Sequence, residues 1–378
     1  MFGKSIRLFK LAGFRVSIDL SWFILFFIIS WSLASAVFPH FIPNLTTAAY
    51  WIMGIAGALG LFASIVFHEL SHSLVARKFG LPMRGITLFV FGGVAEMSDE
   101  PPSPKAEFFM AIAGPIASVI LGFALFGITL LGQAQEWNRP FILVTNYLGS
   151  LNIVLAIFNL IPAFPLDGGR ILRSILWHFQ KDLNRATRIS STIGSFFGIA
   201  LIFVGFFSLF TGAFISGLWW IFIGFFIRNA AQASYQSVLV KKYLEGESIQ
   251  KFMNPHMVTV PSNTPVDMFV ENYLYHYHYI MFPVVRDHKV SCITTQEIKT
   301  LPREKWSSLS VGELARNCSS DNTVSIDNDA MQVLMTMNKT GKNNFMVIDH
   351  ESNLVGIVTL KDLIKHLSLK MELKDNQK

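Results

Sequence analysis

The sequence predicts a polytopic α-helical membrane protein of about six spans, with a membrane-associated β-hairpin or re-entrant loop, followed by a soluble α/β domain pair. Of the 378 residues, 52% are hydrophobic and 15% are charged, and the mean hydropathy is +0.44. In a soluble protein about a quarter of the residues are charged. Residues 1–240 contain long uncharged runs, whereas 241–378 have the composition of an ordinary soluble domain. We therefore expect a membrane domain over 1–240 and a soluble domain over 241–378.

Six apolar runs are each near or above the ~20 residues that a bilayer-spanning helix needs. They cover 17–37, 50–76, 106–132, 141–161, 192–210 and 213–233. Lysine and arginine collect in alternate loops, and the positive-inside rule then places both termini in the cytosol. Because these basic residues lie beside apolar runs, we expect them to set the topology, and we expect no nucleic-acid binding.

Two further segments are expected to lie against the membrane without crossing it. Residues 86–97 are too few to span a bilayer and contain Gly92 and Gly93, which predicts a strand pair or a re-entrant loop. The edge of such a pair could bind an extended peptide by strand addition. A loop on the headgroups is the alternative. Residues 170–190 are basic and amphipathic, which predicts a helix along the inner headgroup layer.

The second apolar run contains His68, Glu69 and His72. In a helix the two histidines lie one turn apart on one face, so their ring nitrogens can converge on a metal ion with Glu69 beside them. This H-E-x-x-H pattern is typical of zinc peptidases, in which the glutamate handles the proton of the attacking water. The alternative is a pair of buried histidines that are hydrogen-bonded within the bundle.

The fourth run contains polar residues of a similar kind. Asn152 and Asn159 lie seven residues apart on one helical face, and polar groups in a span are costly unless they have a partner or a function. The run ends in a Pro-Leu-Asp-Gly-Gly-Arg segment that contains Asp167. Its turn chemistry would also suit an exposed loop.

The predicted topology brings Asp167 close to the histidines. The 18 residues from Tyr50 to Phe67 cover roughly 27 Å of helix, which places His68 toward the cytosolic side of the membrane core. The fourth span also runs inward, so Asp167 reaches a similar depth and is a candidate third ligand. In the third span, Gly114 and Pro115 are expected to serve helix packing and to kink the helix.

The soluble part contains a weak internal repeat. Each half has a valine-containing strand, a polar turn, a helix and then two strands, which predicts two α/β units over about 250–300 and 310–370.

Taken together, the His68 to His72 segment, the glycine pair, the Ala113-Gly114-Pro115 segment and the run from Asn159 to Arg170 resemble the site-2 protease family of intramembrane metalloproteases. The tail resembles a pair of cystathionine-β-synthase (CBS) domains, as in the CBS-bearing prokaryotic branch of that family. The resemblance covers nearly the whole chain.

This resemblance implies a zinc metalloendopeptidase that performs regulated intramembrane proteolysis. His68, His72 and Asp167 would hold one Zn²⁺, and Glu69 would take a proton from the attacking water and pass it to the leaving amine. The residues that would position the substrate backbone or the oxyanion are Asn159, Asn152, Gly92 and Gly93.

The resemblance also implies the partners and the location. The substrate would be a single-span membrane protein, such as an anti-sigma factor, a membrane-tethered regulator or a signal-peptide remnant. The enzyme would be a multi-pass protein in a lipid bilayer, namely a prokaryotic cell membrane.

For the tail, the family pattern places an adenine nucleotide such as ATP at Thr359 and Asp362. The first copy departs from that pattern, with Ser291 and Glu297 at two positions. A purely structural role, or a homodimer formed through the CBS domains, is the alternative for the pair.

Two other function classes fit parts of the sequence. A CBS-regulated membrane channel or transporter would also carry ionisable groups in its spans, but it does not explain a glutamate between histidines at metal-ligand spacing. An inactive scaffold that binds membrane peptides is disfavoured, because every residue that the chemistry requires is present.

Overall fold

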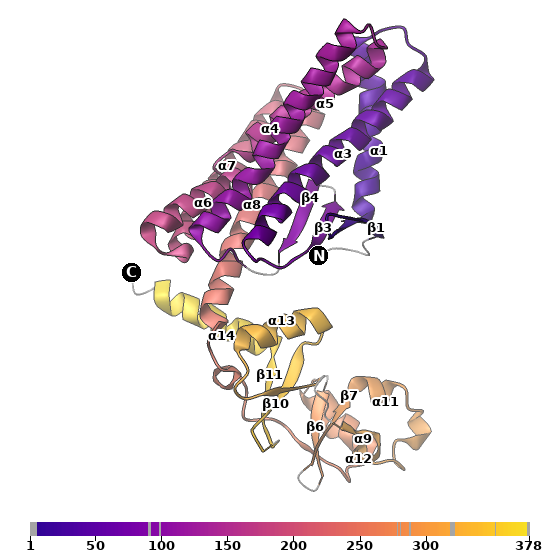
Figure 1. Ribbon diagram of the computed structural model, residues 1–378. Coiled ribbons are helices and arrows are strands. Elements are labelled where there is room, and N and C mark those ends of the chain that lie inside the picture. The colour runs from indigo at the N-terminus through magenta and orange to yellow at the C-terminus, as the bar shows by residue number, and fades with distance from the viewer. Residues whose placement is uncertain are drawn as a thin grey trace. The chain divides into compact units, whose positions relative to one another are not determined.

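A computed structural model describes residues 6–89, 92–97, 100–277, 279, 281–286, 289–317, 322–351 and 353–375. The chain forms two compact units, Met1–Gln236 and Ser237–Lys378 (Figure 1). Both this division and the boundary expected at residue 240 fall inside one helix, α8 (Phe214–Leu244).

Unit 1 contains the six predicted spans, which are confirmed by six helices in the described residues that are long and apolar enough to cross a membrane. The first span consists of α1 (Leu20–Ser32), a π-helical turn (Leu33–Val37) and α2 (Phe38–Phe41). The other five are α3 (Thr47–Lys78), α4 (Pro104–Ala134), α5 (Arg139–Asn159), α7 (Leu183–Phe210) and α8.

Most of these helices begin where a side chain can accept a hydrogen bond from an otherwise unpaired backbone N–H group. Asp19 accepts from the N–H of Ser21, Thr46 caps α3 and Ser103 caps α4, where Pro104 follows at the first helical position. Such caps satisfy amide groups that the helix itself leaves free.

A four-stranded sheet lies beside the end of the bundle at which α1 begins and α3 ends (Figure 1). Its order is β1 (Ile6–Leu11), β2 (Phe14–Ile18), β3 (Met83–Phe89) and β4 (Gly92–Met97). The strand pair predicted over 86–97 is present as the antiparallel β3–β4 hairpin. Because β4 is the last strand in this order, its outer edge pairs with no other strand of the sheet.

The first two strands were not predicted, and the first span begins later than expected. Ser17 belongs to β2, which pairs in parallel with β3, and the helix starts at Leu20. Phe14, Val16 and Ile18 share one face of the strand and are buried, and Ser17 on the other face is buried as well. A hydropathy run cannot separate such a strand from the helix that follows it.

The amphipathic helix predicted over 170–190 is divided in the structure. Helix α6 (Asp167–Gln180) ends at Lys181, which adopts a left-handed conformation with φ of 57°. Asp182 then caps α7 by accepting from the N–H groups of Asn184 and Arg185. The left-handed Lys181 ends α6. The Asp182 cap starts α7 at the next position.

Unit 2 contains the predicted α/β repeat, but its first copy extends to Asn317, past the boundary expected between 300 and 310. The first copy contains a sheet in the order β5 (Val260–Pro261), β6 (Met281–Arg286), β7 (Lys289–Thr294) and β8 (Arg316–Asn317). The second copy contains a sheet in the order β11 (Leu354–Thr359), β10 (Asn344–Ile348) and β9 (Thr323–Ser325). The helices are α9 (Val266–Phe269), α10 (Tyr275–Tyr277), α11 (Thr295–Lys299), α12 (Val311–Leu314), α13 (Ala330–Thr340) and α14 (Leu360–Asp375). Each copy has its own apolar core, around Phe269 in the first and Phe345 in the second.

Candidate metal centre and active site

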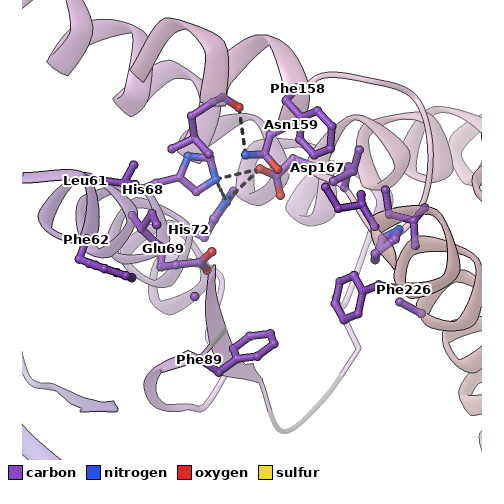
Figure 2. A pocket seen from close by; sticks show the side chains of 18 of the residues that line it. Leu61, Phe62, His68, Glu69, His72, Phe89, Phe158, Asn159, Asp167 and Phe226 are labelled. Atoms are coloured by element: carbon purple, nitrogen blue, oxygen red, sulfur yellow. Dashed lines mark hydrogen bonds and ion pairs between the residues drawn. The ribbon is translucent and has the colours of Figure 1, made fainter. Parts of the chain in front are cut away.

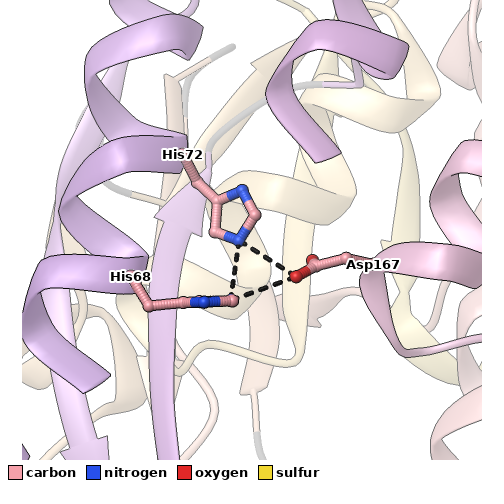
Figure 3. Close-up of side chains that lie close together, drawn as sticks. All are labelled: His68, His72 and Asp167. Carbon is pink, nitrogen blue, oxygen red and sulfur yellow. Dashed lines mark hydrogen bonds and ion pairs between the residues drawn. The ribbon is translucent and has the colours of Figure 1, made fainter. Parts of the chain in front are cut away.

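Three potential metal ligands meet between α3 and the start of α6. His68 and His72 lie one turn apart on α3, and Asp167 is the first residue of α6. The Nε2 atoms of the two histidines are 3.1 Å apart, and the Asp167 Oδ2 atom is 3.1 Å from the first and 3.2 Å from the second (Figure 3). Among the described residues, this is the one group of three or more such side chains within metal-binding distance of one another.

The outer nitrogen of each histidine is engaged elsewhere. His72 Nδ1 lies 2.6 Å from the carbonyl oxygen of Met110, and His68 Nδ1 lies 2.9 Å from the hydroxyl of Ser118. A carbonyl oxygen can only accept, so His72 Nδ1 carries the proton, and in the neutral ring Nε2 presents a lone pair. Such outer partners orient the histidine ligands of metal sites.

The arrangement fits a zinc ion. His72 Nε2 and Asp167 Oδ2 are both acceptors and lie only 3.2 Å apart, which a cation between them would stabilise. Zinc ligands at about 2.0–2.1 Å in a tetrahedral arrangement lie about 3.3 Å from each other. The nitrogen and oxygen donors are also the types that zinc prefers, and three protein ligands are typical of a catalytic site.

The Asp167 carboxyl is suited to this role because it is ionised. Burial by itself raises its pKa, but whenever His72 is protonated, its charge and the hydrogen bonds from the two histidines lower that pKa more, and it falls well below its ordinary value. A carboxyl group must lose its proton before it can bind a metal.

Gly114 of α4 lies directly against the two ligand nitrogens. A Cβ atom at this position would be 2.2 Å from His72 Nε2 and 2.6 Å from His68 Nε2. Both distances are too short for a side chain, so only glycine fits unless a neighbouring group moves. We expected Gly114 to serve helix packing in general, and its place at the site was not predicted. A glycine inside a helix costs about 1 kcal/mol relative to alanine, and that cost is the signal that could have drawn attention to it.

A cavity of about 620 Å³ opens beside the three ligands. Glu69 is half-buried and lines it, and Figure 2 shows its carboxylate directed into the space between His72 and Phe89. Much of the remaining wall is apolar, with Phe62, Phe158 and Phe226 among its residues. Ligand-binding cavities of about 300–1,000 Å³ with such walls are common in proteins.

The β4 edge strand also approaches this cavity. Gly93 lines it, and a Cβ atom on Gly93 would be 2.7 Å from Glu69 Cγ. Gly92 pairs with Phe89 at the turn of the hairpin. The glycine backbone therefore comes closer to Glu69 than a larger residue would allow.

The two asparagines occupy different places. Asn159 lines the cavity and donates its side-chain amide to the Leu155 carbonyl oxygen at 3.0 Å. Asn152 is 1% exposed and is not among the cavity-lining residues. Its amide donates to the Ser64 hydroxyl at 2.9 Å, which links α5 to α3. The structure thus brings Asn159 to the candidate site and leaves Asn152 within the bundle.

Two regions of the chain match models of known protein families. Residues 56–142 and 129–203 match the model of Peptidase family M50, and residues 311–369 match that of the CBS domain. The Synechocystis protein sll0528 is 30% identical over 96% of this chain and 96% of its own length. Zinc metalloprotease MJ0392 of Methanocaldococcus jannaschii is 30% identical over 98% of this chain and 99% of its own length.

The chain belongs to Peptidase family M50. Among solved structures, a site-2 protease from M. jannaschii is 32% identical and covers 61% of this chain and 95% of its own, with a TM-score of 0.43. The resemblance to site-2 proteases with a CBS tail is confirmed. This M50 peptidase is a multi-pass membrane zinc metalloendopeptidase, and its family acts on membrane-embedded substrates.

A buried ion pair in the M50 peptidase holds α6 against α4. Arg173 donates to Glu107 with Nε at 2.6 Å, pairs with Glu100 at 3.3 Å and lies 5.1 Å from the Phe164 ring centre. Arg173 is 3% exposed and Glu107 is 1% exposed. Because α6 begins with Asp167, this pair helps to set where that carboxylate lies. This ion pair was not predicted, although Glu107 is the one charged residue in the run 106–132 and charged residues within a span are commonly paired.

In the CBS tail, the candidate nucleotide residues cap a helix. The Thr359 hydroxyl donates to Asp362 Oδ2 at 2.6 Å, and the Asp362 N–H donates to the Thr359 hydroxyl at 3.1 Å. In the first copy, Thr294 and Glu297 form the equivalent capping box, and Glu297 also pairs with Arg316 at 3.2 Å. Both copies therefore use this position to start a helix.

Proposed function

We propose that this M50 peptidase hydrolyses a peptide bond within or next to the transmembrane segment of a single-span membrane protein. His68, His72 and Asp167 would hold the zinc ion, and Glu69 would act as the general base. The observation that carries this proposal is the convergence of three ligand atoms within 3.1–3.2 Å of each other, next to an apolar cavity in the membrane domain.

When bound, Zn²⁺ would act as a Lewis acid that polarises the scissile carbonyl group, and it would lower the pKa of the attacking water. Glu69 takes one proton from the attacking water and delivers it to the leaving nitrogen as the C–N bond breaks. The products are a new carboxyl terminus and a new amino terminus. The half-buried position of Glu69 on the cavity wall supports this role, because a base must lie within reach of the proton that it moves.

The substrate has to become extended before hydrolysis, because a helical segment shields its amide groups. We propose that such a segment adds to the free edge of β4 at Gly92 and Gly93, where backbone groups can replace the lost helical hydrogen bonds. The nearness of Gly93 to Glu69 supports this position. Asn159, on the cavity wall, would position the substrate backbone or the oxyanion.

We place the enzyme in a prokaryotic cell membrane with both termini in the cytosol, on the basis of the basic residues in alternate loops. Candidate substrates are an anti-sigma factor, a membrane-tethered regulator or a signal-peptide remnant. The membrane peptidase domain would cover 1–240, and the CBS pair would cover 241–378.

The Glu69→Gln variant tests the catalytic assignment. It removes the general base and retains the three metal ligands, so we expect about one zinc per chain in both proteins and cleavage of a single-span reporter by the wild type only. Metal analysis and gel-based cleavage in detergent measure the two quantities. Full cleavage by the variant, or absence of zinc from the wild type, would contradict the proposal.

For the tail, we propose that the second CBS copy binds an adenine nucleotide at Thr359 and Asp362 and thereby regulates the peptidase. The Gly356 to Asp362 segment supports this, because the second copy retains the residues that the first copy has replaced. Equilibrium ATP binding to the full-length protein tests it. Asp362→Asn should weaken binding, whereas Glu351→Gln in an exposed turn should not. A wild-type protein without nucleotide affinity would leave the pair with a structural or dimer-forming role.

A further inference from the structure

Arg170 is a cation on the cavity wall, and its charge interacts with that of Glu69. It lies three residues after Asp167 on α6, so the two side chains leave neighbouring positions on the same helix face. Its side chain is half-buried and lines the cavity together with Glu69. Among the described residues, no hydrogen bond or ion pair reaches its guanidinium group.

The next arginine on the same face shows the contrast. Arg173 is paired with Glu107 and Glu100, and it lies over the Phe164 ring. In the described part of the chain, Arg173 thus has acidic partners at hydrogen-bond distance, whereas Arg170 interacts with Glu69 and Glu107 only through their charges. An unpaired charge within a membrane domain is costly, and such a residue commonly marks a functional site. Arg170 is therefore a candidate ligand-binding residue.

An extended peptide in the cavity would need hydrogen-bond donors. Its carbonyl oxygens lose their helical partners, and unsatisfied carbonyl groups away from water are costly. Beyond the β4 edge, few donors near the cavity are free: the Asn159 amide already donates one N–H to Leu155, and the histidine Nδ1 atoms face Ser118 and Met110. Arginine offers five N–H donors in a planar fork.

The walls of the cavity favour a carbonyl ligand over an acidic side chain. Phe62, Phe158 and Phe226 suit an apolar segment, and membrane-spanning segments seldom carry aspartate or glutamate. We propose that Arg170 is a substrate-binding residue that donates to main-chain carbonyl oxygens next to the scissile bond. This inference rests on the proposed function, and it adds a contact for the substrate backbone.

Two single-span reporters test the inference, one with an uncharged cleavage region and one with a single aspartate in that region. We expect Arg170→Ala to lower kcat/KM about 10- to 100-fold on both, because hydrogen bonds from a charged group are worth about 1.5–3 kcal/mol. In Arg170→Lys the decrease in kcat/KM should be smaller, since lysine retains the positive charge but lacks the planar guanidinium donors. Arg188→Ala, at an exposed position of α7, is the matched control and should leave kcat/KM unchanged. Zinc content should be the same in all variants.

Three results would overturn the inference. The first is a kcat/KM of Arg170→Ala equal to that of the wild type, and the second is a lower kcat/KM on the aspartate reporter alone. The third is a lower zinc content of Arg170→Ala, which would mean that Arg170 supports the metal centre. If Arg170→Ala does not fold, Arg170→Lys decides by the same criteria. Cleavage by the wild type and none by Glu69→Gln show separately whether the proposed function holds, so a failure at Arg170 alone is distinguishable.

Discussion

At the scale of single residues, the proposed metal centre depends on groups that would hold no metal themselves. Gly114 leaves the space in which the two Nε2 atoms lie, and Ser118 and Met110 engage the outer ring nitrogens. The H-E-x-x-H pattern predicts the histidines because one helical turn brings them together. It cannot predict these three residues, which come from another helix and are selected by packing.

We expect Gly114→Ala to lower zinc affinity at least 10- to 100-fold, the range typical when a group that supports a metal ligand is changed. The added Cβ would overlap His72 Nε2, so α4 or the imidazole has to move. Zinc titration and reporter cleavage measure the effect. Gly127→Ala on the same helix is the control, because a Cβ there meets nothing within 4 Å. Normal zinc content in Gly114→Ala would show that the helices can separate without cost.

At the scale of elements, the position of α6 determines whether a third ligand exists. This helix begins with Asp167 and is held against α4 by the Arg173–Glu107 pair. We expected residues 170–190 to lie along the headgroups as one segment, but the left-handed Lys181 and the Asp182 cap divide it. Local turn chemistry of this kind is difficult to see in an amphipathic pattern.

Arg173→Met should destabilise the membrane domain by about 3–5 kcal/mol, because it leaves the Glu107 carboxylate buried without its partner. We also expect lower zinc occupancy, since α6 carries Asp167. Thermal unfolding in detergent and metal analysis report the two effects. The double variant Arg173→Met with Glu107→Leu should recover much of the stability, because an apolar pair can replace a buried ion pair. Equal stability of the single variant and the wild type would argue against a structural role.

At the scale of the whole molecule, the proposed metal ligands join segments that are far apart in the chain. His68 and Asp167 are separated by 99 positions, and they meet only when α3 packs beside the start of α6. A metal bound there would therefore stabilise the folded membrane domain as well as supply the chemistry. Binding to the folded state alone raises stability by mass action.

Removal of zinc by a chelator should lower the unfolding temperature and abolish cleavage, and added zinc should restore both. Glu69→Gln should show the same shift in unfolding temperature, since its three ligands are intact. His72→Ala, which lacks a ligand, should show little shift. Differential scanning fluorimetry with and without chelator measures this. An unfolding temperature in the wild type that does not respond to chelator would speak against a metal between α3 and α6.

By itself the sequence determined the six spans, the short hairpin, the α/β repeat and the clustering of His68, Glu69 and His72. These features follow from local rules, namely the length of a bilayer, the two-residue period of a strand and the turn of a helix. Only the tertiary structure decided which distant groups meet. It placed Asp167 at the histidines, Gly114 against them and Asn159 on the cavity, and it hydrogen-bonded Asn152 to Ser64. Within the residues that the structure describes, it gave Arg170 no hydrogen bond or ion pair. Contacts between helices depend on how their side chains interlock, and no spacing along one segment encodes that.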